Sequence, residues 1–271
     1  MLNLNQHHIM TILNVTPDSF FEGSRCDEEG AIRSRIERAI AEGATIIDIG
    51  GYSSRPGADD VSIELEWQRV DLGFGTLRKV SSEVVVSVDT FRAEIVRRCA
   101  EKYGYFVVND IMAGEGDPQM FDTVAKYRLP YIAMHMRGTP QQMQSMTEYR
   151  DVAREVTEYL QERIKLMRQA GIEEIVIDPG FGFAKSLKQN YELMASLPML
   201  CELGYPVLVG ISRKSMIYRA LNTTPTEALT GTIALNWEAL RQGATILRVH
   251  DTREAVETLQ LYRIYEKSIK Q

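Results

Sequence analysis

The strongest constraint on the fold is a regular alternation along the chain, in which short apolar runs rich in β-branched residues are followed by longer segments with helical spacing. Eight such runs occur: HIMTILN from His8, TIIDIG from Thr45, EVVVSVD from Glu83, YFVVND from Tyr105, LPYIAMH from Leu129, EEIVIDP from Glu173, YPVLVGI from Tyr205 and TILRVHD from Thr245. Most are apolar throughout, as expected for strands that are buried on both faces. The alternation predicts a parallel α/β sheet.

The segments between these runs predict helices that pack on the sheet. Two apolar stripes have helical spacing, one of Ile32, Ile36, Ala39 and Ile40 and one of Val152, Val156, Tyr159, Leu160 and Ile164. The sequence Gly-Ala-Thr-Ile occurs at both Gly43 and Gly243, where it is typical of a helix that ends at glycine directly before a strand. The chain therefore repeats a strand and helix unit.

The number of these units favours a closed barrel. An open doubly wound sheet is the alternative, but such sheets usually show a GxGxxG turn after the first strand or a switch in strand order, and neither signal is present. The chain has 271 residues, which suits a barrel of about 250 residues, and no linker or charge block interrupts the series. We predict a single (β/α)8 TIM-barrel domain over residues 1–271.

Composition excludes several classes of partner. The net charge is −6 and the isoelectric point is about 5.4, which opposes extended binding to nucleic acid or to an anionic membrane. The first ten residues do not resemble a signal peptide, and no apolar run approaches a membrane span. Cys26, Cys99 and Cys201 lie far apart, without a CxxC pair, and are interpreted as reduced thiols. We predict a cytoplasmic protein that binds neither nucleic acid nor membrane.

Polar residues follow almost every predicted strand. They are Asn14, Ser53-Ser54-Arg55, Asp89, Asn109-Asp110, His135, Asp178, Ser212-Arg213-Lys214 and Arg248-Val249-His250. Each alone is explained as well by a turn or a helix cap. Caps do not require an acid, an amide and a cation to face one another, however, and the carboxyl ends of barrel strands meet at one mouth. The pattern predicts an active site there.

The types of residue at this mouth indicate a flat heterocycle and an anion. Asp89, Asn109 and Asp178 offer two carboxylates and an amide, which suit the N–H-rich edge of a 2-amino-pyrimidinone ring, and Lys214 can donate to the ring carbonyl. Phosphate is expected at three cationic side chains, those of Arg55, Arg248 and His250. Asn14 beside a pyrophosphate would suit Mg²⁺, which keeps most of its waters.

Three loops have a second interpretation each. FFEGSRCDEEG and YSSRPGADD, after the first and second strands, have the composition of loops that close over a site, or of ordinary surface loops. DPGFGFAK, from Asp178, offers either an aromatic wall for a flat second substrate or a turn with core residues.

Taken together, the motifs resemble the dihydropteroate synthase family. They are ILNVTPDSF from Ile12, GGYSSRPGA from Gly50, SVDT from Ser87, NDI from Asn109, MHM from Met134, DPGFGF from Asp178, GISRKSM from Gly210 and RVHD from Arg248. They occur in order over nearly the whole chain. The resemblance implies condensation of 6-hydroxymethyl-7,8-dihydropterin pyrophosphate with p-aminobenzoate, to give 7,8-dihydropteroate and pyrophosphate.

The resemblance also assigns residues to each substrate. It implies that the pterin contacts Asp89, Asn109, Ile111, Met134, Asp178, Lys214 and Arg248, that pyrophosphate and Mg²⁺ contact Asn14, Ser54, Arg55, Arg248 and His250, and that aminobenzoate lies beside Pro56, Phe183, Lys214 and Ser215. The charged groups expected to act in catalysis are Asp89, Lys214, Arg248 and His250. A homodimer through the later helices is implied as well, with Trp237 and Leu240 either at the interface or in the core.

Some positions depart from the family pattern. The family commonly has an acid where Tyr52 stands, Thr in place of Ser54, and Gly in place of Ala184 and of Thr11. Few residues precede the first strand to seal the bottom of the barrel.

Three other functions fit parts of the sequence. A pterin-binding methyltransferase acting on a tetrahydrofolate and a corrinoid protein would not need the SRKS and RVHD motifs. A Schiff-base aldolase would use Lys214. A non-catalytic pterin-binding paralogue would account for Tyr52 as a sign of lost activity.

Overall fold

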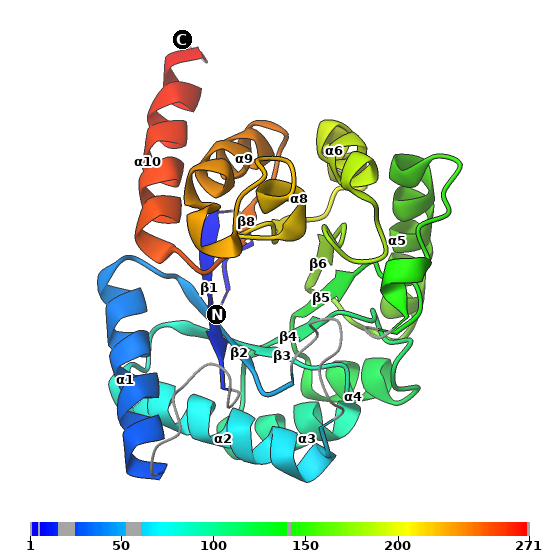
Figure 1. Cartoon of the computed structure of the whole chain (residues 1–271). Coiled ribbons are helices and arrows are strands. Elements are labelled where there is room, and N and C mark those ends of the chain that lie inside the picture. The colour runs from blue at the N-terminus through cyan, green and yellow to red at the C-terminus, as the bar shows by residue number, and fades with distance from the viewer. Residues whose placement is uncertain (1, 5, 16–24, 53–60, 140–141, 270–271) are drawn as a thin grey trace.

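The computed structural model describes residues 2–4, 6–15, 25–52, 61–139 and 142–269, and its strands form a parallel barrel (Figure 1). The strands are β1 (His8–Asn14), β2 (Ile46–Gly50), β3 (Val85–Asp89), β4 (Val107–Asp110), β5 (Tyr131–Met134), β6 (Ile175–Asp178), β7 (Leu208–Val209) and β8 (Ile246–Val249). Their order in the sheet is β6-β5-β4-β3-β2-β1-β8-β7. A parallel bridge between Ile177 and Val207 joins the two end strands and closes the barrel.

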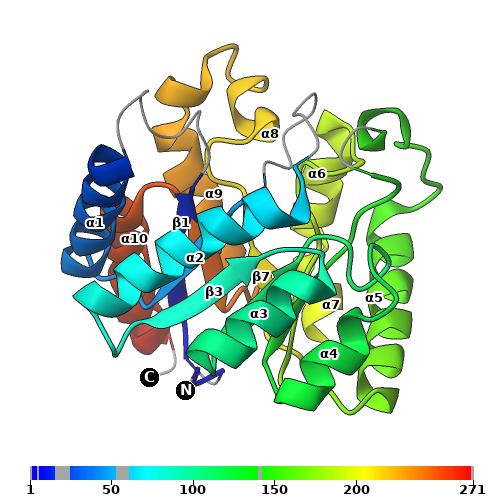
Figure 2. The same cartoon turned by 90° about the horizontal axis from the view of Figure 1, so that it is seen from below.

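Helices surround this ring of strands. They are α1 (Arg25–Ala41), α2 (Ile63–Val80), α3 (Ala93–Tyr103), α4 (Met120–Tyr127), α5 (Val152–Gln169), α6 (Leu187–Ala195), α7 (Leu197–Cys201), α8 (Ser215–Tyr218), α9 (Leu229–Arg241) and α10 (Thr252–Ile269), with short 3₁₀ turns at Met143–Ser145 and Pro225–Glu227. Figure 2 shows α2 and α3 on either side of β3. The main hydrophobic core fills the layer between the strands and the helices.

A smaller core fills the barrel itself. Successive residues of a strand point to opposite faces, so alternate residues point inward. One inward layer consists of Met10, Ile46, Val107, Ile132, Val176, Leu208 and Ile246. Leu2 is buried against this layer, and its N–H donates to the Tyr105 hydroxyl at 3.1 Å. The short N-terminal segment therefore seals the barrel at the end opposite to its mouth.

The predicted barrel is confirmed, and all eight predicted strands are present. Both apolar stripes pack against the core. Gly43 and Gly243 have φ values of 100° and 105°, and in each case the N–H of the following alanine donates to the carbonyl five residues earlier at 2.9 Å. The seventh strand is shorter than the seven residues predicted, since only Leu208–Val209 is extended in the ladder. Pro206 has no N–H to donate, which limits pairing at the start of this run.

Within the described residues, no helix is long and apolar enough to cross a bilayer. Cys99 and Cys201 are free thiols, as predicted, and burial raises the pKa of each. The side chain of Cys26 lies outside the described part of the structure.

Candidate active site

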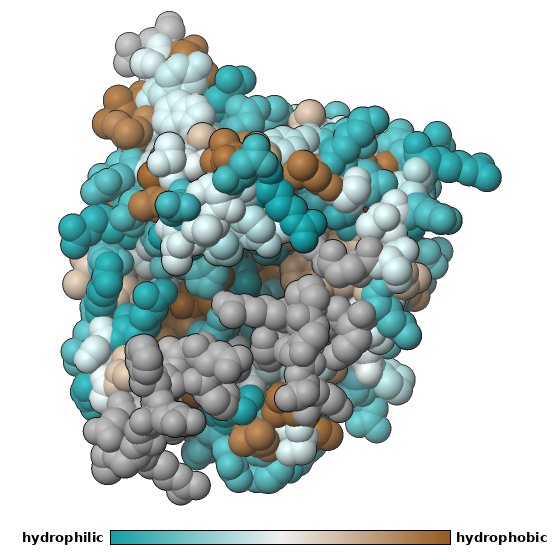
Figure 3. Space-filling model, viewed as in Figure 1, coloured by the Kyte–Doolittle hydropathy of each residue, from teal (hydrophilic) through white to brown (hydrophobic). Residues whose placement is uncertain are grey.

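Above the apolar layer the interior of the barrel becomes polar. Going up each strand by two residues from that layer brings Asp48, Asn109, Asp178 and Arg248 to the inside, and Asp89 lies at the top of β3. In the view of Figure 3 the space-filling surface is hollowed over the strand ends, where hydrophilic and hydrophobic residues meet. Side chains from five strands thus converge on one mouth, as predicted.

Arg248 is the centre of this polar layer. Its Nε donates to Asp48 Oδ2 at 2.7 Å, and its Nη2 donates to Asp89 Oδ2 at 2.7 Å. Asn109 Nδ2 also donates to Asp48 Oδ2, at 3.1 Å. Gly210, after β7, lies beside this arginine, and a Cβ there would be in ordinary van der Waals contact with Arg248 Cβ, at 3.7 Å. The result is one hydrogen-bonded network across β2, β3, β4 and β8.

The carboxylates in this network are held in an environment that disfavours charge. Burial raises the pKa of Asp89 to about 7, and the Arg248 guanidinium opposes this rise. Burial also raises the pKa of Asp178, against the influence of Lys214 and of the Gly180 N–H. Both groups therefore gain from a ligand that brings N–H donors to the mouth.

The loop after β6 is built around two buried polar side chains. Asp178 Oδ1 accepts from the Gly180 N–H at 2.7 Å. Lys185, which is 7% exposed, donates through Nζ to the carbonyls of Gly180 and Phe183 at 2.9 and 3.0 Å and lies 3.0 Å from Nδ1 of His135. Burial lowers the pKa of Lys185 to about 7 and that of His135 to about 2, so the imidazole is neutral. The lysine fixes the path of the loop.

This loop in turn places Lys214 at the mouth. Lys214 Nζ donates to the Phe181 carbonyl at 2.7 Å and lies 4.5 Å from the centre of the Phe183 ring. Burial lowers the pKa of Lys214 to about 8, although Asp178 counteracts the effect. A cationic donor and an aromatic ring therefore share one side of the site.

An apolar wall completes the described part of the mouth. Ile111 and Met134 are 6% and 3% exposed and belong to a cluster with Met136, Met143 and Ala184, against which Phe183 packs. A flat ring bound by the polar groups would lie against this cluster.

The remaining predicted site residues lie at the rim. Asn14 ends β1, and a Cβ on Gly50 would lie 3.3 Å from its Oδ1 and 3.9 Å from Asp89 Oδ2. The backbone N–H of His250 donates to Ser212 Oγ at 3.2 Å, and Ser215 begins α8. Ser54, Arg55 and Pro56 lie outside the described residues.

Three polar residues at strand ends do not reach the mouth, and the expectation that they do was wrong. Asp110 points to the helix layer, where it accepts from the Tyr131 hydroxyl at 2.5 Å and from two backbone N–H groups. His135 points the same way, with its ring 4.9 Å from that of Tyr159. Both are adjacent to an inward residue, so strand alternation turns them outward. Arg213 instead pairs with both Asp251 oxygens, at 2.8 and 2.9 Å.

Two site residues were missed in the sequence. Asp48 is the one charged residue inside the run TIIDIG, and a charge in a strand buried on both faces was the available signal. Lys185 follows the DPGFGF motif, and its role depends on contacts with His135 that sequence spacing does not reveal.

Of the positions that depart from the family pattern, Thr11, Ala184 and Tyr52 are described by the structure. Thr11 points out of the barrel, and its hydroxyl lies 2.8 Å from that of Thr252 on α10. Ala184 is buried with a positive φ of 49°, a conformation that glycine adopts more easily. Tyr52 packs edge-on against Phe91 and lies 5.4 Å from the Arg92 guanidinium. Arg92 also pairs with the buried Glu66 at 2.8 Å. The Glu66 carboxylate therefore already balances the charge of Arg92, and an acid at position 52 is not needed for this.

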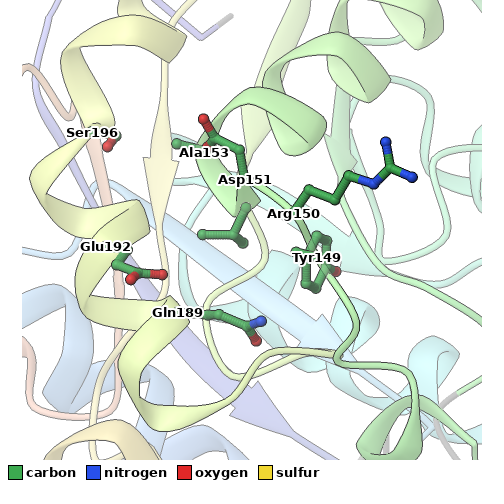
Figure 4. Close-up of a pocket in the computed structure, with 8 residues that line it drawn as sticks. Tyr149, Arg150, Asp151, Ala153, Gln189, Glu192 and Ser196 are labelled. Carbon is green, nitrogen blue, oxygen red and sulfur yellow. The ribbon is translucent and has the colours of Figure 1, made fainter.

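A second hollow lies outside the barrel mouth, between the start of α5 and α6 (Figure 4). Its side chains serve the fold. Asp151 caps α5 by accepting from the Arg154 N–H at 3.1 Å, and Gln189 Nε2 donates to the Thr147 carbonyl at 2.8 Å. This hollow contains none of the predicted site residues.

Fold and site together define a barrel enzyme of the pterin-binding class, and residues 10–250 match the family described as pterin binding enzyme. The chain is 44% identical to the dihydropteroate synthase of Escherichia coli strain K12 over 264 residues, which cover 96% of this chain and 92% of that protein. The structure of Xanthomonas albilineans dihydropteroate synthase with 4-aminobenzoic acid matches with a TM-score of 0.90 and 40% identity, covering 98% of this chain and 95% of that one. The structure from the same organism in complex with 7,8-dihydropteroate matches with a TM-score of 0.87 and 36% identity, with the same coverage. The chain belongs to the dihydropteroate synthase family of transferases.

Proposed function

We propose that this enzyme condenses 6-hydroxymethyl-7,8-dihydropterin pyrophosphate with p-aminobenzoate, to give 7,8-dihydropteroate and pyrophosphate. The observation that carries the proposal is the position of Arg248, which lies between acceptors suited to a ring and the rim where an anion would bind. The ligands of the Xanthomonas relatives, an aminobenzoate and a dihydropteroate, agree with this choice of substrate and product.

The pterin ring is placed in the polar layer. Asp89 and Asp178 accept from its N–H groups, Asn109 donates and accepts, and Lys214 donates to the ring carbonyl. Ile111 and Met134 pack against the ring face. Binding of the ring gives the two carboxylates further hydrogen-bond donors, which favour the ionised forms that burial disfavours.

The pyrophosphate is placed at the rim. Arg248 and His250 meet the negative charge that grows on it as it leaves, and Ser54 and Arg55 are assigned to the same group. Mg²⁺ fits here, because Asn14 supplies a hard amide oxygen at the end of β1, and this ion takes few protein ligands. When bound, Mg²⁺ would neutralise pyrophosphate charge and so favour its departure. Among the described residues there is no cluster of three acidic, His or Cys side chains, in keeping with an ion held largely by substrate and water.

The aminobenzoate is placed beside Phe183, Lys214 and Ser215, with Pro56 on the loop after β2. In the reaction, the bond between the ring methylene and the pyrophosphate oxygen breaks, and the pyrophosphate keeps the electron pair. The arylamine nitrogen forms the new bond with its lone pair and releases one proton. Because the arylamine is neutral at pH 7, positioning supplies much of the rate, and no general base is assigned.

The first test measures pyrophosphate release and dihydropteroate formation with purified protein, Mg²⁺ and both substrates. We expect product only when both substrates are present, and loss of activity with a chelator that is restored by added Mg²⁺. Arg248→Met should lower kcat/KM by on the order of 100-fold or more, because it removes the cation that meets the developing charge. Pterin binding without any product would contradict the synthase function and leave a binding protein.

We also propose that the enzyme is a cytoplasmic homodimer that acts on small molecules. The apolar side chains of Leu261 and Ile264 are 61% and 67% exposed on α10, and Tyr265 beside them is 42% exposed. Figure 3 shows hydrophobic residues along the side of this helix. Of the two residues first considered for the interface, Trp237 contacts Tyr262 and Tyr265 of α10, whereas Leu240 is 1% exposed and belongs to the core. Free thiols such as that of Cys99 suit a reducing compartment.

A further inference from the structure

Asp48 is a carboxylate inside the barrel that is not among the groups assigned to the substrate. Asp48 is fully buried in the middle of β2. Oδ2 accepts hydrogen bonds from Arg248 and Asn109, while Oδ1 has no partner among the described residues. A buried charge is costly unless it is paired, and replacing such a pair by apolar residues is often neutral or stabilising. The fold alone therefore gives no reason to keep an acid here.

The two acids that hold Arg248 differ in their access to the mouth. The side chain of Asp89 is 17% exposed, whereas that of Asp48 is 0% exposed. A bound pterin ring would bring N–H donors to Asp89 and would compete with the guanidinium for this carboxylate. Asp48 is closed off from the mouth and would keep its hydrogen bond to Arg248 Nε if Asp89 changed partner.

We propose that Asp48 is a positioning residue that anchors Arg248 beneath the ring site, so that Asp89 is free to exchange the guanidinium for the N–H groups of the substrate. This inference rests on the proposed function. It adds a role for a carboxylate that touches neither the ring nor the leaving group.

The anchor also affects the charge of Asp89. Burial, then Asp48, Glu66 and Asp110, raise the pKa of Asp89, and Arg248 opposes them. Lys214 also interacts electrostatically with Asp89. Because ring binding needs ionised Asp89, substrate affinity should rise as pH increases through about 7. Neutralising Asp48 removes a negative charge near Asp89 and leaves Asp89 as the only acid paired with Arg248. Both changes lower the pKa of Asp89, so the rise in substrate affinity should move to lower pH.

The test compares Asp48→Asn with the wild type for kcat, for KM of the pterin pyrophosphate, and for pterin affinity between pH 5.5 and 9. We expect kcat/KM at pH 8 to fall about 10- to 100-fold, the range expected for loss of a hydrogen bond to a charged group. KM should rise, because Asp89 now holds Arg248 alone and gives it up less readily. The acidic limb of kcat/KM should move to lower pH.

Asp110→Asn is the matched control, because Asp110, on β4 two strands away, is as fully buried but points to the helix layer. The Asp110→Asn variant should be less thermally stable than the wild type. The acidic limb of its kcat/KM profile should move less than that of Asp48→Asn. An Asp48→Asn enzyme with wild-type kcat/KM and an unmoved limb would overturn the proposal. So would a fall in kcat/KM that only follows the folded fraction.

A second variant covers the case in which Asp48→Asn does not fold. Asp48→Ala leaves space for a small carboxylate, and added formate should restore kcat/KM severalfold where chloride does not. A folded Asp48→Ala enzyme without such rescue argues against the anchor, and failure of both variants to fold assigns Asp48 to the fold instead. If the wild type itself forms no dihydropteroate, the proposed function fails, and pterin affinity alone then reports on Asp48.

Discussion

At the scale of single residues, this protein buries more charged side chains than the strand pattern suggests. Lys185 shows what such a group does. The residue is 7% exposed, and its ammonium is bound to two carbonyls of one loop and to a neutral imidazole. Burial lowers its pKa to about 7, so the native state holds this proton weakly.

Lys185→Met should therefore change how stability depends on pH. The native pKa of about 7 lies below the ordinary value of 10.5, so between these pH values the unfolded chain holds a proton that the native state lacks. The free energy of unfolding of the wild type should rise over this window, by up to about 1.4 kcal/mol per pH unit for this group. The variant should show a shallower rise in urea titrations from pH 7 to 10. Lys214, with a pKa lowered to about 8, supplies part of the remainder.

Lys188→Met is the control for this experiment, because that side chain is 86% exposed. Its unfolding free energy should keep the wild-type slope. Equal slopes in wild type and Lys185→Met would show that Lys185 keeps an ordinary pKa.

At the scale of elements, the loop after β6 depends on one backbone conformation. Gly180 has a φ of 69°, and a Cβ there would lie 2.0 Å from the His135 carbonyl oxygen. The same loop carries the Phe181 carbonyl that binds Lys214. Strain at Gly180 would therefore move a wall of the active site.

Gly180→Ala should lower the free energy of unfolding by at least about 2 kcal/mol, since it combines a left-handed backbone with a steric clash. KM for aminobenzoate should rise as well. Gly171→Ala is the control: its φ is 92°, but a Cβ there meets no atom within 4 Å, so only the backbone cost of about 1 kcal/mol applies. Both are measured by chemical denaturation. Equal losses in the two variants would rule out the clash as a cause.

The elements were largely predictable, and the reasons are specific. Strands buried on both faces leave continuous apolar runs, and Gly43 and Gly243 mark helix ends by a conformation that few other residues adopt. The strand-end rule found Asp89, Asn109, Asp178 and Arg248 because a parallel barrel brings these ends together. It failed for Asp110 and His135, because each follows an inward-pointing residue directly and so points to the opposite face of its strand. The Lys185 clamp depends on tertiary contacts between β5 and a loop, which local sequence does not encode.

At the scale of the whole molecule, the barrel has an apolar face outside its core. Leu261 and Ile264 lie on α10 with most of their surface exposed, next to the aromatic contacts of Trp237. Exposed apolar patches of this kind mark association sites. They support the proposed homodimer.

The double variant Leu261→Glu and Ile264→Glu should sediment as a monomer at concentrations where the wild type is a dimer, because two buried charges per subunit would lose their hydration at the interface. Analytical ultracentrifugation measures this. Leu166→Glu, at a position 37% exposed on α5, should remain a dimer. A monomeric wild type would contradict the homodimer, and a dimeric double variant would exclude this face as its interface.

The closure of the barrel has a final consequence. β7 has two residues in the ladder, and the bridge between Ile177 and Val207 joins it to β6. Asp178 and Phe183 follow one side of this seam, and Lys214 follows the other. A substrate that contacts all three residues would connect the β6 side of the barrel to the β7 side. Binding would therefore oppose separation of these two strands, which few ladder hydrogen bonds hold together. Catalysis and the integrity of the barrel are therefore thermodynamically linked, and the empty enzyme is the form most exposed to proteases.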